Sequence, residues 1–353
     1  MKVPAAALAA LLAGCASVGP TTVSRDRFEY VQAISDSWKS QMLLNLVKVR
    51  YADVPVFLDV TSVINAYSFE TEANVSAQAA PVNRGDTFLG AGATGRYSER
   101  PTISYAPLTG DKFAKSVMSP LPVSGILLLV QSGYPADIVL RLCVNSINGL
   151  ENARNGVGAP RPADPAFREL LALLREDQEQ GGVAFEARPG AGKKAMAMIL
   201  REPANDAMGK RNRRIAQLLG VKPGIRELDV GYGSIPTGDT EIALLSRSML
   251  QIMANVASSF DVPERDVAEG RVTATRLDEA DPMVLRVHES AEKPADGFVS
   301  VRYRDRWFWI DDRDSPSKRV FAFLMLMFSL TDRHGTGRAR AHDPGPLGRK
   351  KTK

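Results

Sequence analysis

Three carboxylates lie close together in the stretch Asp311-Asp312-Arg313-Asp314. Carboxylate oxygens can hold Ca²⁺ or Mg²⁺, and they can also act as general acids and bases. The same stretch comes directly before an expected helix, where acidic side chains accept hydrogen bonds from free backbone N–H groups. Asp311, Asp312 and Asp314 are therefore either an acid/base or weak metal site or the start of a helix. We favour the helix start and expect no bound metal or cofactor.

A second group of residues could bind a ligand. Arg302, Arg304 and Arg306 alternate along an expected strand, which predicts that all three project from one face. Trp307 and Trp309 follow directly. We therefore take Arg302, Arg304, Trp307 and Trp309 as the candidate surface for an anionic envelope glycan or a partner protein, with a solvated sheet face as the alternative.

Two glycine motifs match nucleotide-binding patterns only in part. Gly90–Gly95 reads GAGATG, but the residues that follow are poor helix formers, and dinucleotide binding needs a helix there. Gly190–Lys194 lacks the hydroxyl residue that a phosphate-binding loop uses to hold Mg²⁺. We interpret the first as strand glycines and the second as a hairpin turn.

Two further features have simple structural interpretations. Cys143 lies in an apolar segment without a neighbouring histidine, so we expect a buried thiol rather than a nucleophile. The run Lys210–Arg214 places four cations within five residues of a helix, where adjacent side chains fan around the axis. It predicts a solvated face, with phosphate recognition as the alternative.

The N-terminus predicts export and a lipid anchor. Residues 1–14 form a short apolar segment ending in Leu-Ala-Gly, and Cys15 follows. This run is too short to span a bilayer and is typical of a signal peptide. It resembles the lipobox of bacterial lipoproteins, which implies acylation of Cys15 after cleavage before it. By the same resemblance, Ala16 after the cysteine implies sorting to the outer membrane. Residues 15–25 are expected to form a flexible tether on the periplasmic side.

The charge distribution argues against a nucleic-acid-binding domain. Residues 332–353 carry seven Lys or Arg and two Asp, which accounts for the whole formal net charge of +5. This basic tail is rich in Gly and Pro and is expected to be disordered. The rest of the chain is neutral overall, so no nucleic-acid partner is expected.

The order of the elements predicts an α+β fold. A helix is expected over residues 35–50, followed by two long alternating arms that make a hairpin around a turn at 83–86. The Gly- and Pro-rich residues 153–165 are the predicted boundary between an N-terminal half, 26–152, and a C-terminal half, 166–331. Residues 319–330 are apolar on all sides, which predicts a buried helix.

Several stretches together resemble a group of uncharacterised proteobacterial lipoproteins. They are QMLLNLVKVRYADVPVFLDVTSV, PTISYAPLTGDKF, LLLVQSGYPADIVLRL, SINGLENAR and WFWIDDRD with KRVFAFLMLMFSL. This resemblance covers most of residues 36–331 and implies no catalytic or binding residue. We expect a non-enzymatic scaffold or accessory factor in envelope assembly or export, with envelope proteins or further copies of the chain as partners. In a bolder form of this hypothesis the hairpin tip, Ala73–Tyr97, adds strands to a multimeric outer-membrane barrel, and an ordinary surface hairpin is the favoured alternative. An envelope hydrolase using the Asp cluster and a glycan-binding module are the alternatives.

Overall fold

The computed structural model describes residues 20–78, 88–156, 159–188, 196–275 and 285–332. The chain forms two units: Met1–Ser37 with Val56–Leu108, and Trp38–Pro55 with Thr109–Lys353. Helices and mixed sheets occur together, so the predicted α+β class is confirmed. The predicted signal peptide, Cys15 and tail residues 333–353 lie outside the described residues. Within those residues, no helix has both the length and the hydrophobicity that a membrane crossing requires.

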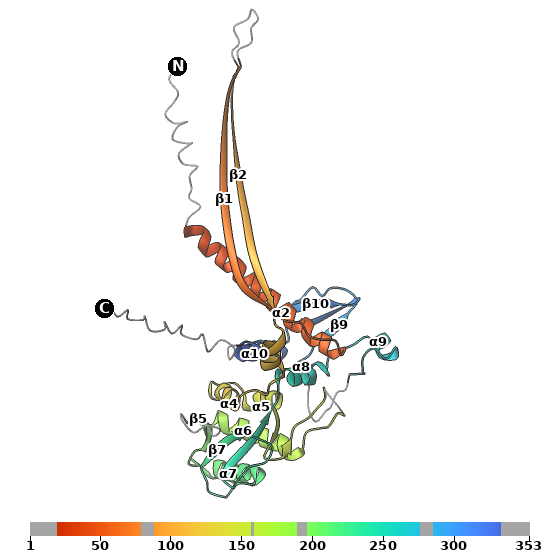
Figure 1. Ribbon diagram of the computed structural model, residues 1–353. Helices are drawn as coiled ribbons and strands as arrows, with labels where there is room; N and C mark the ends of the chain where they lie inside the picture. Colours follow the sequence, from red (N-terminus) through yellow and green to blue (C-terminus); the bar gives the residue numbers. More distant parts are fainter. Residues whose placement is uncertain (1–19, 79–87, 157–158, 189–195, 276–284, 333–353) are drawn as a thin grey trace, which may run out of the picture. The chain divides into compact units, whose positions relative to one another are not determined.

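The first unit contains one very long hairpin. Strands β1 (Leu58–Gln78) and β2 (Phe88–Pro107) pair in antiparallel register from Leu58 opposite Pro107 to Gln78 opposite Phe88. The register shifts once, between Val60 and Ser62. Figure 1 shows the two strands side by side over their whole length. The predicted hairpin is confirmed, and its expected turn at 83–86 lies outside the described residues.

Helix α2 (Pro20–Arg50) is longer than the sequence predicts. Its C-terminal part contains the predicted helix 35–50, but it begins at Pro20, inside the predicted tether of residues 15–25. The tether prediction is therefore wrong for residues 20–25, where Thr and Ser continue the helix without a breaking residue. Within the second unit, Met42, Leu43, Leu46 and Val47 form its buried stripe.

The second unit contains the remaining elements. Its helices are α3 (Gly110–Phe113), the π-helix η1 (Ala114–Met118), α4 (Val123–Gln131), α5 (Ala136–Cys143), α6 (Pro165–Glu179), α7 (Asp206–Leu219), α8 (Met249–Ala257), α9 (Glu264–Ala268) and α10 (Ser315–Asp332). Its strands are β3 (Val144–Ile147), β4 (Leu150–Glu151), β5 (Val183–Ala187), β6 (Met196–Leu200), β7 (Glu227–Tyr232), β8 (Glu241–Ser246), β9 (His288–Ser290), β10 (Gly297–Tyr303) and β11 (Arg306–Asp311).

A six-stranded sheet crosses the boundary that the sequence predicts at residues 153–165. Its order is β4-β3-β8-β7-β6-β5, and only β7 and β8 run parallel. Strands β3 and β4 precede the predicted boundary and the other four follow it, so the division into halves is wrong. The described parts of this segment, residues 153–156 and 159–165, are held in place instead: the backbone of Arg154 pairs with that of Arg161, and a Cβ on Gly156 would collide with the backbone of Ala254. Gly and Pro in this segment allow close packing rather than flexibility.

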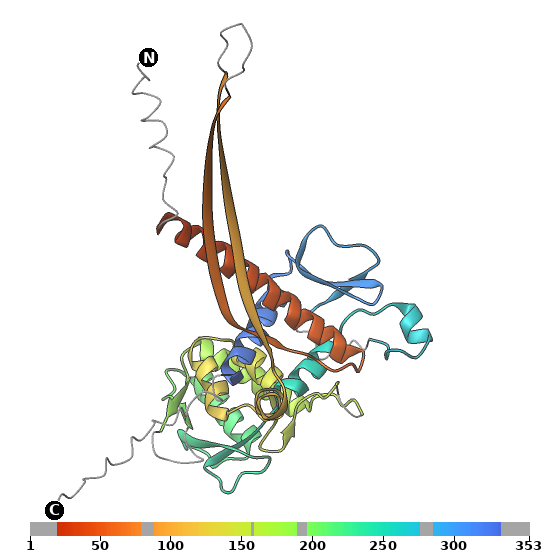
Figure 2. The same ribbon diagram turned by 45° about the horizontal axis from the view of Figure 1, so that its top comes forward.

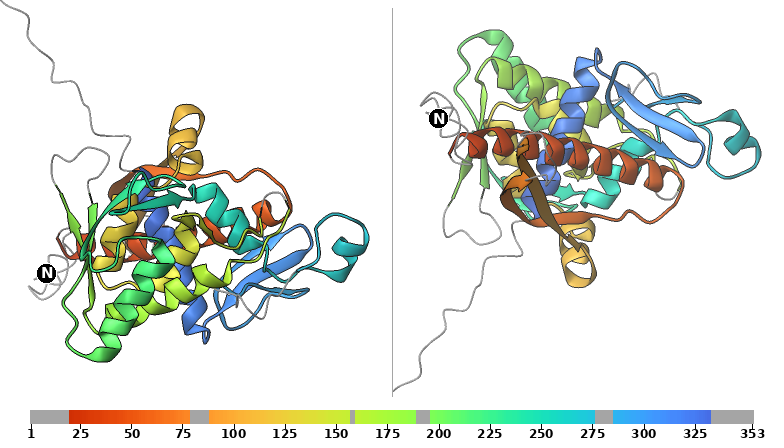
Figure 3. Two further views of the ribbon diagram at one scale, coloured as in Figure 1. Left: turned by 90° about the horizontal axis from the view of Figure 1, so that it is seen from below. Right: turned by 90° about the horizontal axis from the view of Figure 1, so that it is seen from above.

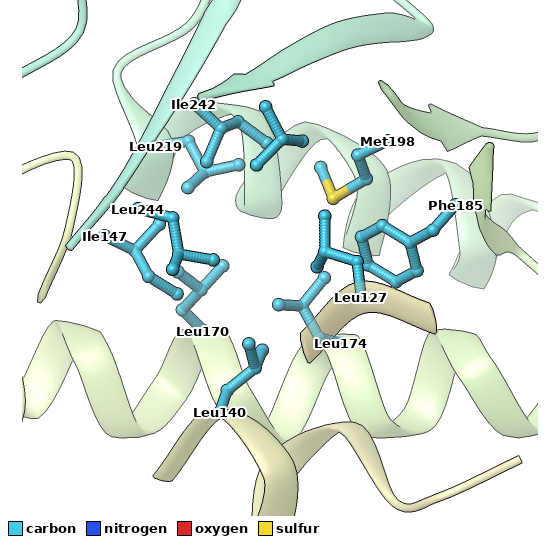
Figure 4. A pocket seen from close by; sticks show the side chains of 11 residues that line it. Leu127, Leu140, Ile147, Leu170, Leu174, Phe185, Met198, Leu219, Ile242 and Leu244 are labelled. Atoms are coloured by element: carbon cyan, nitrogen blue, oxygen red, sulfur yellow. The ribbon is translucent and has the colours of Figure 1, made fainter. Parts of the chain in front are cut away.

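The main core lies between this sheet and the helices that cover it. Leucines of α4, α5 and α6 meet apolar side chains from the strands, including Phe185, Met198 and Ile242 (Figure 4). The void between them is about 20 Å³ and is lined by apolar side chains alone. A void with this apolar lining stays dry, because a buried water needs polar partners. This region is a packed core rather than a ligand pocket.

Helix α10 is the second organising element of this unit. Val320, Phe321, Phe323, Leu324 and Met327 are buried, and Ala322 is exposed. The ring of Phe321 meets Phe298 of β10, and the ring of Phe323 meets Tyr134, which follows α4. Figures 2 and 3 show α10, in dark blue, running between the three-stranded sheet and the helices of the larger sheet. The predicted buried helix is confirmed.

Candidate functional site

The small sheet, ordered β10-β11-β9, carries most of the predicted ligand surface on one face. Alternation along its strands separates two sets of residues. Val299, Val301, Phe308 and Ile310 are buried on the inner face. The outer face has two cross-strand rows: Arg302, Trp307 and Ser290, and then Ser300, Trp309 and His288. The sheet therefore brings Arg302, Trp307 and Trp309 together, as the sequence predicts.

Charged and aromatic groups surround the two tryptophans. Lys293 Nζ lies 5.5 Å from the ring centroid of Trp307, and the ring of His288 lies 4.9 Å from that of Trp309. His288 Nδ1 is 3.2 Å from the Asp261 carboxylate, which holds the imidazole in place. Arg302 is 63% exposed and only weakly paired with Asp305 at 4.0 Å. The sequence analysis did not include His288 or Lys293, because their approach depends on strand β9.

Trp309 has an unusual polar group. Its indole Nε1 is buried and has no hydrogen-bond partner within the described part of the chain. Buried indole N–H groups are usually paired, since an unmet donor costs free energy. Chemically, this face offers flat aromatic surfaces for sugar rings, with Arg302 and Lys293 as partners for acidic groups. It is suited to binding.

Arg304 and Arg306 do not belong to this face, so the predicted arginine ladder is wrong. Strand β10 ends at Tyr303, and Arg304 occupies the turn with a φ of +52°. Its guanidinium lies 4.9 Å from the ring centroid of Tyr51. Arg306 is on the inner face and forms an ion pair with Glu289. The sequence pattern failed here because the turn interrupts the alternation between residues 302 and 306.

Tyr51 is the centre of a structural cluster that the sequence analysis missed. Its hydroxyl donates to Asp266 at 2.7 Å, and its ring packs against Tyr303 and Phe308. Burial and the hydrogen bond to Asp266 raise the pKa of Tyr51 well above its ordinary value. The phenol is therefore a neutral donor that joins residues 38–55 to the small sheet.

The Asp cluster has structural partners. Asp311 accepts from the Arg313 N–H at 2.8 Å, and the Asp312 carboxylate lies 2.7 Å from Lys318 Nζ. Asp314 accepts from both the N–H and the hydroxyl of Ser317, at 3.1 and 2.7 Å, at the start of α10. These contacts support the helix-start interpretation. In the described ranges, no three His, Cys, Asp or Glu side chains are close enough together to hold a metal ion.

Two pKa shifts agree with that interpretation. The hydrogen bond from the Arg313 N–H lowers the pKa of Asp311. Burial raises the pKa of Asp314, but the two hydrogen bonds from Ser317 together outweigh it, and the net pKa is below the ordinary value. A general acid at neutral pH needs a raised pKa. Both carboxylates are instead held ionised.

The other candidate residues belong to other elements of the chain. Cys143 is fully buried, and burial raises the pKa of its thiol to about 12, which favours the protonated thiol. Arg211 is also buried, so the prediction of a solvated face is wrong at this position. Gly90–Gly95 lie within β2, without a helix after them. Gly190–Lys194 lie outside the described residues.

The hairpin offers a second kind of functional surface. Within the described part of the chain, β1 and β2 pair only with each other, so each has an unpaired outer edge. Two-stranded sheets are marginally stable alone, and long open edges readily pair with other strands. Val56, Ile64 and Tyr105, at or near its base, are exposed. The hairpin is therefore suited to assembly.

Comparison with family models, curated proteins and solved structures gave no match to this chain.

Proposed function

We propose that this chain is a lipoprotein, anchored in the outer membrane through Cys15 and facing the periplasm. It acts as a non-enzymatic scaffold or accessory factor in envelope assembly or export. The observation that carries the proposal is the hairpin of β1 and β2, which has about twenty residues in each strand and pairs with no third strand among the described residues. Long open edges of this kind are templates for pairing with further strands.

A second copy of the chain is the partner that the hairpin fits best. The outer edge of β1 can pair with the outer edge of β2 in the next copy, which is a head-to-tail contact that closes into a ring or continues as a filament. Glu70 and Glu72 lie on β1, and Arg96 and Arg100 lie on β2. Glu70 is opposite Arg96 within one hairpin, so pairing of copies in the same register would place the acidic β1 edge beside the basic β2 edge.

The N-terminus supports the anchor. Leu-Ala-Gly-Cys15 is the lipobox pattern, and each buried methylene of an acyl chain contributes about 0.8 kcal/mol of membrane affinity. Two or three acyl chains hold a protein stably at a membrane surface. Mass spectrometry of the N-terminal peptide tests this step directly, since an unmodified Cys15 in the exported protein contradicts it.

The native mass of the lipidated protein in mild detergent tests the scaffold. We expect an oligomer or a stoichiometric complex for the full chain. In the matched variant, Asn-Gly replaces residues 69–97 and joins Ser68 to Ser98, which are register partners. This variant is expected to elute as a monomer with an unchanged unfolding transition. A full-length chain that elutes as a lone monomer contradicts the proposal.

A glycan-binding module is the second candidate, favoured by the shared face of Arg302, Trp307 and Trp309. We expect the soluble Cys15→Ser form to bind lipopolysaccharide or peptidoglycan fragments, and Trp307→Ala to weaken binding at least tenfold. Ser300→Ala, in the neighbouring row, is the matched control. Binding that is absent, or equal in both variants, removes this candidate. The engaged carboxylates of the Asp cluster do not favour the hydrolase alternative.

A further inference from the structure

The distal hairpin has an apolar face and a polar face. Five successive cross-strand pairs make up the apolar face: Phe69–Tyr97, Thr71–Gly95, Ala73–Ala93, Val75–Ala91 and Ala77–Leu89. The alternate pairs make up the other face: Glu70–Arg96, Glu72–Thr94, Asn74–Gly92, Ser76–Gly90 and Gln78–Phe88. Charged residues are absent from the first set, and polar residues or glycine occupy nearly all of the second. This period of two is the pattern of a strand with lipid on one side and water on the other.

The length of the apolar face matches a bilayer. It runs over residues 69–77 of β1 and 89–97 of β2, which is nine residues in each strand. At about 3.3 Å per residue, nine residues extend about 30 Å. Bilayer-crossing strands need about 9–11 residues. The apolar face is therefore long enough to cross the hydrocarbon layer and little longer.

The proximal end of the face has the residues expected at a membrane surface. Phe69 pairs with Tyr97 at the proximal end, and aromatic residues are enriched where strands meet the headgroups. The next pair on the same face is Tyr67 with Glu99, so charge begins immediately outside the nine-residue stretch. The apolar face therefore has a defined proximal boundary.

The open edges link membrane entry to assembly. An unpaired N–H or C=O in hydrocarbon costs several kcal/mol, so a lone hairpin cannot enter a bilayer. Edge-to-edge pairing of copies satisfies these groups, and the opposite charges of Glu70 and Arg96 lie on the polar face of such an assembly. Gly90 and Gly92 lie on the same face, where small residues let neighbouring backbones approach closely.

From this register we propose that residues 69–77 and 89–97 cross the hydrocarbon of a lipid bilayer when several copies pair through their hairpin edges. The inference rests on the proposed self-assembly and adds the lipid bilayer as the partner of the apolar face. The polar face then surrounds a water-filled interior.

Single-cysteine labelling of the lipidated full chain tests the inference. Acylated Cys15 has no free thiol, and Cys143 is buried, so an introduced cysteine takes the label selectively. An environment-sensitive fluorophore is attached at Ala73→Cys or Val75→Cys on the apolar face, and at Asn74→Cys or Ser76→Cys on the polar face. Each protein is placed in phosphatidylethanolamine and phosphatidylglycerol vesicles that contain a quencher on the acyl chains. The native mass is measured on the same samples.

We expect severalfold stronger quenching at positions 73 and 75 than at 74 and 76, in an oligomer. An oligomer with equal quenching at all four positions overturns membrane crossing and leaves the scaffold proposal standing. A monomer overturns both. As a second readout, Val75→Arg is expected to abolish quenching at position 73 while the oligomer in detergent persists, and the matched Ser76→Arg is expected to retain quenching. Equal behaviour of the two arginine variants overturns the inference.

Discussion

Arg211 and Asp177 form an ion pair inside the core, with Arg211 Nε 2.6 Å from Asp177 Oδ1. The Asp177 side chain is 0% exposed and that of Arg211 is 5% exposed. Arg211 also donates to Glu176 and Gln180. The pair joins α7 to α6. Arg211 belongs to the run Lys210–Arg214, which is typical of a solvated face, yet its side chain fixes the packing of these two helices. Removing Arg211 leaves the buried Asp177 carboxylate without its cation, and removing Asp177 leaves Arg211 with only the exposed Glu176 as a charged partner.

Asp177→Ala is therefore expected to lower the free energy of unfolding by about 3–5 kcal/mol, because Arg211 loses its buried partner. Urea unfolding followed by circular dichroism measures the change. Glu176→Ala is the matched control. Its side chain is 52% exposed, and loss of an exposed pair costs about 1 kcal/mol or less. If the two variants lose equal amounts of unfolding free energy, burial of the carboxylate does not determine what its ion pair contributes to stability.

Gly182→Ala tests the close approach to the same carboxylate. A Cβ at Gly182 would lie 2.7 Å from Asp177 Oδ1, which the ion pair holds in place. We expect a loss of about 1–3 kcal/mol from this overpacking. Gly125→Ala in α4 has open space around its Cβ and is expected to stabilise by up to about 1 kcal/mol. The urea midpoints of the two variants should therefore move in opposite directions. A Gly182→Ala protein as stable as the wild type contradicts the close packing of Gly182 against the Asp177 carboxylate.

Elements with a strong period could be predicted from the sequence, and contacts between distant segments could not. The alternation of β1 and β2 and the apolar run of α10 each indicate their element directly. Strand β8 was missed because the short run EIALLS follows a Gly-rich turn and forms a strand only between β3 and β7. The segment at 153–165 was misread because composition does not show that Gly156 packs against the backbone of Ala254.

In the candidate site, too, local patterns could be predicted and contacts between distant segments could not. Alternation correctly places Trp307 and Trp309 on one face, because both lie within β11. It fails for Arg304, which lies past the end of β10 and contacts Tyr51, more than 250 residues earlier in the chain. No local pattern reports such a contact. The burial of Arg211 likewise depends on a partner on another helix.

Asp314 is expected to make the free energy of unfolding depend on pH in the acid range. Its pKa is lowered in the folded protein, so its contribution is present above the ordinary pKa of an aspartate and is lost as pH falls through the folded value. Asp314→Ala is expected to cost about 1 kcal/mol at neutral pH, as for other helix caps, and less in acid, where the wild type has also lost the contact. Unfolding midpoints across the acid range measure this. Fully exposed Asp305 gives the control Asp305→Ala, which should not change the dependence.

Cys143 is expected to report unfolding of the second unit. Its thiol is buried and its pKa is raised to about 12, so the thiolate that reacts with disulfide reagents is scarce in the folded protein. The rate of labelling in a Cys15→Ser protein should be very low in buffer and should rise in urea together with the loss of circular dichroism. Rapid labelling of the folded protein contradicts this burial.

Arg302 and Arg304 provide a matched test of which arginine faces the ligand surface. Arg304 lies over Tyr51, and a partly exposed cation–aromatic contact contributes about 0.5–1 kcal/mol, so Arg304→Ala is expected to lower the unfolding midpoint slightly and leave glycan binding unchanged. Arg302 is exposed beside Trp307, so Arg302→Ala should leave stability unchanged and weaken binding of an acidic glycan. Both variants are measured by thermal unfolding and by binding of the soluble form to lipopolysaccharide. If Arg304→Ala instead abolishes binding at unchanged stability, the turn rather than the outer face of the sheet contacts the ligand.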